Sequence, residues 1–335
     1  MRGYLFRTLL FLLIGTLPVW LLVRLSKRYP PSFEEKAAIE RVEAVTGNLE
    51  RMEALSVGNS HARAIDFDGM QLEGREIGLP WNDAAETEFQ IRTLAPKMPR
   101  LRTVFIALSY FSFHWANEHG EDDRLLIGRR LFYAATPYPR WMRGDLDNFV
   151  VGKSYWLARP DNWQMVLWPL LGRNPEEAQE REYYLDRTQE NTDAELSQHA
   201  ESRVPRTLTA MSVIQENHPE VVAETFASLS ATIRLLRERG VRVVLFTPPY
   251  YHRYRTLYAG EPTLPEMKRL AERLRVEHGV EYYDFSEDEL SLEPENFRDS
   301  DHLNFRGKER FTQRLAAAMR TGSALSSYAP PSSRE

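Results

Sequence analysis

The chain has 335 residues, of which 42% are hydrophobic and 27% charged, and these proportions exclude a fibre and a wholly disordered protein. Lys and Arg total 43 against 48 Asp and Glu, a net charge of −5. Because there is also no long basic block, we expect no nucleic-acid partner. The absence of cysteine excludes disulfides, thiolate metal sites and a cysteine nucleophile.

An apolar segment lies near the start of the chain. Residues 8–23 read TLLFLLIGTLPVWLLV without a charge, two arginines precede them, and three basic residues follow. This pattern is typical of a membrane segment. No small-x-small cleavage site follows it, so we interpret residues 1–30 as an uncleaved single-span anchor rather than a signal peptide. The basic residues nearly balance across the span, so charge alone does not decide its orientation.

Beyond the anchor, the pattern alternates between helices and strands. Residues 31–53 predict a stalk or outer helix, because Ser32 can cap a segment with an acidic first turn and helical spacing of apolar residues. Strands are then expected at residues 54–57, 76–79, 103–108, 241–246 and 280–284, and helices from Ala62 and at 84–94, 219–239, 265–278 and 308–319. Because parallel strands need crossover helices, residues 54–320 predict a doubly wound, flavodoxin-like α/β domain. We expect about five mostly parallel strands in the order 2-1-3-4-5.

Residues 118–218 interrupt this alternation, and we interpret them as a long insertion or lid. The segment is rich in Trp, Tyr and Arg and includes the charged stretch EEAQEREYYLDRTQE. Its aromatic residues can stack on sugar rings, although packing is the commoner role. They are Trp141, Tyr155, Trp156, Trp163 and Trp168. Residues 321–335 are expected to form a loose tail.

The sequence Gly58-Asn59-Ser60-His61 directly follows the first expected strand. In an open parallel sheet, ligands bind beyond the carboxyl ends of the strands, where the N–H groups of a following helix also point. A serine at that position suits a nucleophile whose substrate develops an oxyanion. The alternative is a helix cap at Asn59 or Ser60, which the motif alone favours.

A second motif, Asp299-Ser300-Asp301-His302-Leu303-Asn304, precedes the last expected helix. A histidine shortly after an aspartate can present one ring nitrogen while the carboxylate holds the other. The loop therefore offers both a general base and its orienting group. The alternative is a solvated acidic loop in which Asn304 caps the helix, and the motif alone does not decide between the two.

We expect neither a cofactor nor a metal. The chain has no Gly-rich phosphate loop and no GxGxxG sequence, and its remaining histidines lack the spacing of metal ligands.

Taken together, Ser60 near the start and the Asp299–His302 pair near the end resemble the SGNH (GDSL-like) hydrolase superfamily. The resemblance implies that Ser60 is the nucleophile, His302 the general base and Asp299 its partner, with Asp301 the second choice. The anchor, GNSHA and DSDHLNFRG are similar to membrane-anchored SGNH proteins of bacterial cell-surface modification. These include relatives of the alginate acetylation proteins and of the protein acting in teichoic acid D-alanylation.

The middle of the chain departs from the pattern of this superfamily, whose best-known members carry a Gly after strand two and Gly-x-Asn-Asp after strand three. No Asn stands at the expected third place. The Ser60 N–H remains one candidate oxyanion donor, and Asn82 or the region of Ser109 is a candidate for another. Because losing one donor costs roughly 100-fold to 1,000-fold in rate, a noncatalytic member also fits the sequence.

The resemblance implies a membrane-anchored esterase or O-acyltransferase that acts on cell-surface polysaccharide, most simply on O-acetyl groups, through an acyl-serine. A membrane-bound O-acyltransferase is the implied partner. The alternative is a noncatalytic assembly or polysaccharide-binding protein that keeps the fold. We expect an anchor with its N-terminus in the cytoplasm and the body of the chain outside the cytoplasmic membrane, again from the resemblance.

Overall fold

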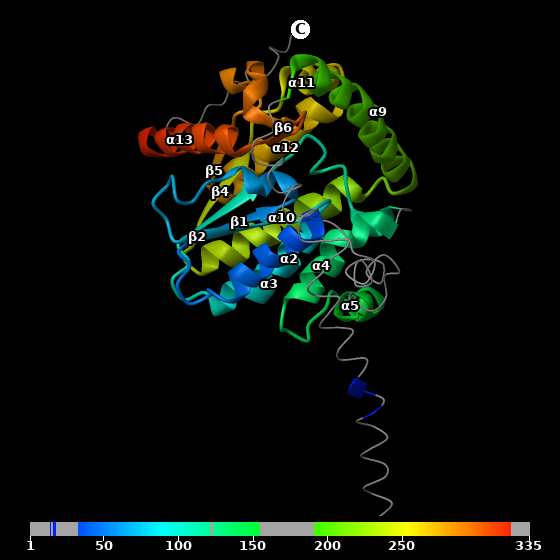
Figure 1. Cartoon of the computed structure of the whole chain (residues 1–335), viewed down its shortest axis with the longest axis vertical. Helices are drawn as coiled ribbons and strands as arrows, with labels where there is room; N and C mark the ends of the chain where they lie inside the picture. Colours follow the sequence, from blue (N-terminus) through cyan, green and yellow to red (C-terminus); the bar gives the residue numbers. More distant parts are fainter. Residues whose placement is uncertain (1–13, 15, 18–32, 121–122, 155–190, 323–335) are drawn as a thin grey trace, which may run out of the picture. The chain divides into compact units, whose positions relative to one another are not determined.

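The computed structural model describes residues 14, 16–17, 33–120, 123–154 and 191–322. The predicted anchor falls almost wholly outside these residues, as do the tail and, of the aromatic residues singled out in the predicted insertion, Tyr155, Trp156, Trp163 and Trp168. Within the described ranges, no helix has the length and apolar character needed to cross a membrane. The chain divides into two compact units, residues 1–40 with 130–185 and residues 41–129 with 186–335, and Figure 1 labels their helices and strands.

The larger unit is built on a five-stranded parallel sheet in the order β2-β1-β3-β4-β5, which confirms the predicted α/β class and strand order. The strands are β1 (Ala54–Gly58), β2 (Gly74–Gly78), β3 (Thr103–Ala107), β4 (Arg242–Thr247) and β5 (Glu281–Asp284). In the parallel register, Val57 of β1 lies opposite Ile77 of β2 and Ile106 of β3. The buried strand residues are mostly aliphatic, as expected for strands covered on both faces.

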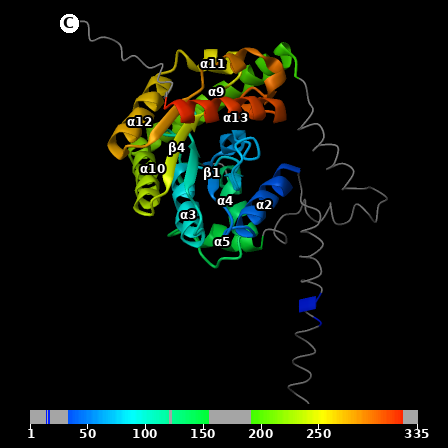
Figure 2. The same ribbon diagram turned by 90° about the vertical axis from the view of Figure 1, so that its left-hand side faces the viewer.

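Helices cover both faces of this sheet (Figures 1 and 2). α13 (Phe305–Thr321) packs Phe311 and Leu315 against Phe105 and Phe246 of the sheet. α3 (Ala84–Leu94) and α10 (Val221–Glu238) contact each other on the opposite face, and α12 (Thr263–His278) follows beside α10. This arrangement places the carboxyl ends of the strands, with their connecting loops, at one edge of the sheet.

The structure describes further elements besides this core. α9 (Asp193–Asn217) packs along α11 (His252–Tyr258), and a short antiparallel pair joins β6 (Phe297–Asp299) to β7 (His302–Leu303). α2 (Phe33–Thr46) forms within the predicted stalk segment. α4 (Ile127–Ala135) and α5 (Leu146–Lys153) follow the third strand. In the smaller unit, Tyr133 Oη donates to Asp145, and the half-exposed Trp141 lies 5.0 Å from the Phe149 ring.

One local expectation needs correction. The segment from Ala62 does not form a long helix: it forms the single 3₁₀ turn η1 (Ser60–Ala64), which ends at Ile65 in extended backbone. The chain then makes a tight turn near Met70 and enters β2 at Gly74, so that little length is left for a helix. Within the segment expected to be an insertion, the helix α9 belongs to the larger unit and packs on α11.

Candidate active site

Ser60 stands at the carboxyl end of β1, on a turn that two glycines permit. Gly58 has φ of +128°, and a Cβ there would lie 3.3 Å from the carbonyl oxygen of Ala107. A Cβ on Gly78, at the end of the neighbouring strand, would lie 3.2 Å from the carbonyl oxygen of Asn59. Asn59 caps η1, because its Oδ1 accepts from the His61 N–H at 3.0 Å. The predicted cap at Asn59 is thus present, and Ser60 remains free to face the site.

His302 and Asp299 lie on the tight turn between β6 and β7. Asp299 Oδ1 accepts from the backbone N–H of Asp301 at 3.2 Å and of His302 at 2.9 Å. Asn304 then caps α13 by accepting from the Gly307 N–H at 3.0 Å. The helix cap and the base–carboxylate pair therefore occur in one loop: Asn304 is the cap, and Asp299, Asp301 and His302 before it carry the ionisable groups.

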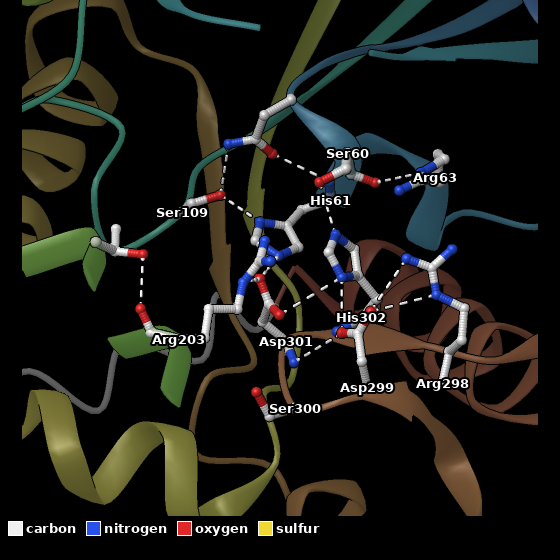
Figure 3. A network of polar contacts seen from close by, with 12 residues as sticks. Ser60, His61, Arg63, Ser109, Arg203, Arg298, Asp299, Ser300, Asp301 and His302 are labelled. Atoms are coloured by element: carbon white, nitrogen blue, oxygen red, sulfur yellow. Dashed lines mark hydrogen bonds and ion pairs between the residues drawn. The ribbon is translucent and has the colours of Figure 1, made fainter. Parts of the chain in front are cut away.

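The structure brings the three predicted residues together in a hydrogen-bonded chain (Figure 3). Ser60 Oγ lies 2.6 Å from His302 Nε2, and His302 Nδ1 lies 2.8 Å from Asp299 Oδ1. Ser60 and His302 are 242 positions apart in the sequence. This geometry is that of a nucleophile, a base and an orienting carboxylate.

The electrostatics of the three residues match the same roles. Burial lowers the pKa of His302 to about 4, even though Asp299 and Asp301 raise it. Burial raises the pKa of Asp299, yet the neighbouring His302 and Arg298 outweigh it and hold that pKa well below its usual range. At neutral pH the imidazole is therefore uncharged, as a general base requires, and the carboxylate that orients it is ionised.

Asp301 is a second carboxylate beside the same imidazole. Its Oδ1 lies 3.5 Å from His302 Nδ1, against 2.8 Å for Asp299, so the geometry favours Asp299 as the orienting group. Its Oδ2 lies 2.9 Å from Arg203 Nε on α9, in an ion pair that is not aligned as a hydrogen bond. Burial raises the pKa of Asp301, but His302 and Arg203 lower it by more, so the net pKa lies below its usual value. Asp301 is therefore ionised, and Arg203 compensates its charge.

His61 belongs to the packing behind Ser60. Its Nδ1 lies 2.5 Å from Ser109 Oγ, which also accepts from Asn59 Nδ2 at 2.7 Å. Its ring is only 3% exposed and lies 4.8 Å from the His302 ring. His61 therefore fixes the position of the turn rather than facing solvent.

The two proposed second oxyanion donors are engaged elsewhere. Asn82 Nδ2 donates to Thr87 Oγ1 at 2.9 Å, and its Oδ1 accepts from Gln90, so the amide is directed toward α3. The Ser109 N–H donates to Ser112 Oγ at 2.7 Å. The Ser60 N–H is at the first residue of η1, where no partner within the helix exists, and it stays a candidate donor.

Two groups of side chains at the site have the proximity of metal ligands: His61, Asp301 and His302, and His199, Asp299 and Asp301. Within each group, the ligand atoms lie within 4.8 Å of one another. However, both ring nitrogens of His302 face hydrogen-bond partners, and Arg203 already places a positive charge against Asp301. A cation at either position would be repelled by that guanidinium.

Sequence reasoning did not identify Arg203, His199 or Trp81. Arg203 and His199 lie on α9, more than 90 residues before the loop that they contact, and no local motif marks them. Trp81 follows β2 directly and has a positive φ of 57°, unusual for a bulky residue. Its position after a strand of the sheet was the one available signal.

Comparison with known proteins adds little to this geometry. No family model matches the chain, and no curated protein matches it. Among solved structures, it is similar to a presumed acylhydrolase from Bacteroides fragilis, with 10% sequence identity, coverage of 84% of this chain and 96% of that chain, and a TM-score of 0.36. The functional assignment therefore depends on the contacts of Ser60, His302 and Asp299 themselves.

Proposed function

We propose that this protein is a serine-dependent esterase or acyltransferase that works through an acyl-Ser60 intermediate. The observation that carries the proposal is the unbroken chain from Ser60 Oγ to His302 Nε2 and from His302 Nδ1 to Asp299 Oδ1. A serine hydroxyl is a weak nucleophile, and it becomes reactive when an oriented neutral imidazole accepts its proton.

In the first half-reaction, Ser60 Oγ bonds to the acyl carbon while His302 Nε2 takes the hydroxyl proton. The bond from the acyl carbon to the leaving oxygen then breaks, and the imidazolium returns the proton to that oxygen. In the second half, His302 takes a proton from water or from a sugar hydroxyl, whose oxygen attacks the acyl carbon. The bond from that carbon to Ser60 Oγ then breaks, and the imidazolium returns the proton to Ser60 Oγ. Asp299 stays ionised throughout and stabilises the imidazolium. Water makes the reaction hydrolysis, and a sugar hydroxyl makes it transfer.

The finer parts of the proposal come from the resemblance of GNSHA and DSDHLNFRG to cell-surface SGNH proteins. They are an O-acetyl group as the acyl group, a cell-surface polysaccharide as substrate or acceptor, and a membrane-bound O-acyltransferase as partner. They also include the N-terminal anchor, with the body of the chain outside the cytoplasmic membrane.

The decisive experiment is labelling with a fluorophosphonate probe, followed by intact-mass and peptide analysis. We expect one probe per wild-type molecule, attached at Ser60, and loss of labelling in Ser60→Ala and His302→Ala. His252→Ala is the matched control, because His252 is a partly exposed histidine that contacts Asp193, away from Ser60. Labelling that persists in His302→Ala, or that occurs at another serine, would contradict the proposal.

A noncatalytic binding protein is the second candidate, because Asn82 and Ser109 are both engaged away from Ser60. This alternative predicts no probe on Ser60 and no turnover of p-nitrophenyl acetate above the rate of Ser60→Ala. Strong labelling that depends on His302 would eliminate it.

A further inference from the structure

A cavity in the larger unit lies apart from the residues that do the proposed chemistry. It has a volume of about 380 Å³, within the range of small-molecule sites. Two tryptophans, Trp81 and Trp115, supply aromatic surface, and three basic residues of α9, namely His199, Arg203 and Arg206, also line it. None of the lining residues that the structure describes is acidic.

The aromatic side of the cavity is held rigidly. The Trp81 and Trp115 rings stack at 5.1 Å with an angle of 19° between their planes. Asn117 ties them together, because its Oδ1 accepts from Trp115 Nε1 and its Nδ2 donates to the Trp81 carbonyl oxygen, both at 2.8 Å. The positive φ of Trp81 is thus maintained by its surroundings, as happens where a strained residue serves a site.

The opposite side of the cavity is cationic. The Arg203 guanidinium lies 5.6 Å from the centre of the Trp81 ring. Arg206 donates to the carbonyl oxygen and hydroxyl of Ser202, and no carboxylate of the described residues pairs with it. Arg206 therefore provides a positive charge at the cavity that no described acidic side chain neutralises.

Arg203 connects the cavity to the loop that carries His302. Arg203 lines the cavity and also pairs through Nε with Asp301, which lies beside His302 (Figure 3). Trp81 follows β2, the strand next to β1, whose carboxyl end leads into Ser60. A ligand in the cavity would therefore lie at the same edge of the sheet as the nucleophile.

We propose that this cavity binds an anionic sugar residue of the substrate or acceptor, a step that rests on the proposed function. The apolar C–H face of a pyranose ring stacks on an indole, and a carboxylate or sulfate on that ring matches the fork of an arginine. An acyl chain fits less well, because it would bury the cationic groups without partners. A neutral sugar would stack but would leave Arg206 without a counter-charge.

The test uses the full chain carrying Ser60→Ala, titrated by calorimetry with trigalacturonic acid, maltotriose and 4-hydroxybenzoate. We expect the acidic trisaccharide to bind at least about tenfold more tightly than maltotriose, with affinity that falls as salt is raised. Trp81→Ala and Arg206→Gln, each added to Ser60→Ala, should weaken that binding about tenfold. Arg273→Gln is the matched control, because Arg273 lies on α12 over the Phe226 ring.

Equal affinity for the acidic and neutral trisaccharides would overturn the anionic part of the inference. Tighter binding of 4-hydroxybenzoate than of the sugar would overturn the saccharide part, and binding unchanged by Trp81→Ala and Arg206→Gln would overturn the location. The proposed function is judged separately by turnover of p-nitrophenyl acetate in the wild-type chain. Turnover without trisaccharide binding removes only this inference, whereas binding without turnover removes only the proposed chemistry.

Discussion

Two pairs of buried carboxylates lie at the carboxyl edge of the same sheet, and their surroundings differ. In the first pair, which we call the scaffold network, Asp83 and Glu86 contact Asn117 and Arg129. Asp83 Oδ1 and Oδ2 accept from the backbone of Glu86 and Asn117, while Glu86 Oε1 and Oε2 accept from Arg129 and Asn117. All four oxygens therefore have partners, and the pair forms the capping box of α3. Burial nevertheless raises the pKa of Glu86 to about 8.

The second pair, Asp299 and Asp301, forms with His302 and Arg203 what we call the loop network. Asp299 is engaged by His302, but neither oxygen of Asp301 accepts an aligned hydrogen bond from the described residues. Asp301 is instead held by charge, through Arg203 at 2.9 Å. Buried polar atoms without hydrogen bonds are uncommon in native structures and need an explanation.

The difference in hydrogen bonding indicates that the scaffold network stabilises the fold, whereas the loop network serves the proposed chemistry. The scaffold network is bonded on every carboxylate oxygen and touches no nucleophile, so its role is to hold α3 and the Trp115 loop. In the loop network, the charged Asp301 carboxylate lacks aligned hydrogen bonds and lies next to the imidazole that faces Ser60. Active sites use such nearby charges to set the pKa of a general base. Each of the following predictions separates these two roles, from the largest expected effect to the smallest.

The largest effect is expected for Asp299→Asn. Removing the charge that orients the imidazole leaves the fold intact but places the wrong tautomer toward Ser60, so kcat for p-nitrophenyl acetate should fall about 10,000-fold. The midpoint of thermal unfolding should change little. Asp301→Asn is the matched control, because Asp301 lies farther from the imidazole, and its loss of kcat should be smaller. A larger loss in Asp301→Asn would make Asp301 the orienting carboxylate.

Arg129→Met should lower the stability of the fold and leave the chemistry unchanged. At pH 9, where Glu86 with its pKa of about 8 is ionised, this change leaves two buried carboxylates without their cation, and breaking a buried ion pair in this way costs about 3–5 kcal/mol of unfolding free energy. Urea denaturation measures the loss, and kcat per folded molecule should stay near the wild-type value. Arg92→Met, which removes an exposed ion pair with Glu88 on α3, should cost under about 0.5 kcal/mol. Similar losses in both variants would contradict a structural role for the scaffold network.

The acid limb of the pH–rate profile reports on the loop network. Because the pKa of His302 is lowered to about 4, kcat/KM of the wild type should rise through about pH 4 and be level at pH 6. Removing the Arg203 charge favours the imidazolium beside Asp299 and Asp301, so Arg203→Met should raise the pKa of His302. We expect the midpoint of the acid limb to move to higher pH by about one unit. A shift in the opposite direction would show that Arg203 does not compensate Asp301.

The smallest effect is expected within the same loop, at Asn304. Asn304→Ala removes the cap of α13, in which Asn304 Oδ1 accepts from the Gly307 N–H, and should lower the unfolding free energy by about 1 kcal/mol. Turnover of p-nitrophenyl acetate should remain close to the wild type. Loss of turnover without loss of stability would mean that Asn304 belongs to the chemistry of the loop.

The α/β class with a parallel sheet could be derived from the sequence because it depends on local signals, and the meeting of Ser60 with His302 was expected from the resemblance of their two motifs to the SGNH hydrolases. Buried strands followed by helices specify a parallel sheet, and each motif stands directly after a strand or before a helix. The contact of Arg203 with Asp301 could not be predicted. It joins a helix to a loop about 100 residues away, and a basic residue on an amphipathic helix is ordinarily solvated.

The short helix η1 was also beyond prediction, since the residues from Ala62 carry a helical pattern. That pattern was outweighed by the tertiary need to turn back into β2, with Ser56 Oγ donating to the Ala62 carbonyl oxygen at 2.8 Å. The engagement of Asn82 by Thr87 and Gln90 depends in the same way on how α3 packs. Side-chain partners of this kind are set by the folded geometry and leave no periodic trace in the sequence.

The 242 positions between Ser60 and His302 have a consequence for how the protein is made. A chain emerging from the ribosome completes β1 and its turn well before the loop that carries His302 has been synthesised. Bringing such distant segments together is slow, because the chain loses the entropy of loop closure before the contacts that offset this loss can form. If Ser60 is the nucleophile, as proposed, it stays unactivated until that loop has been made, and the appearance of probe-reactive Ser60 would time the completion of folding during synthesis.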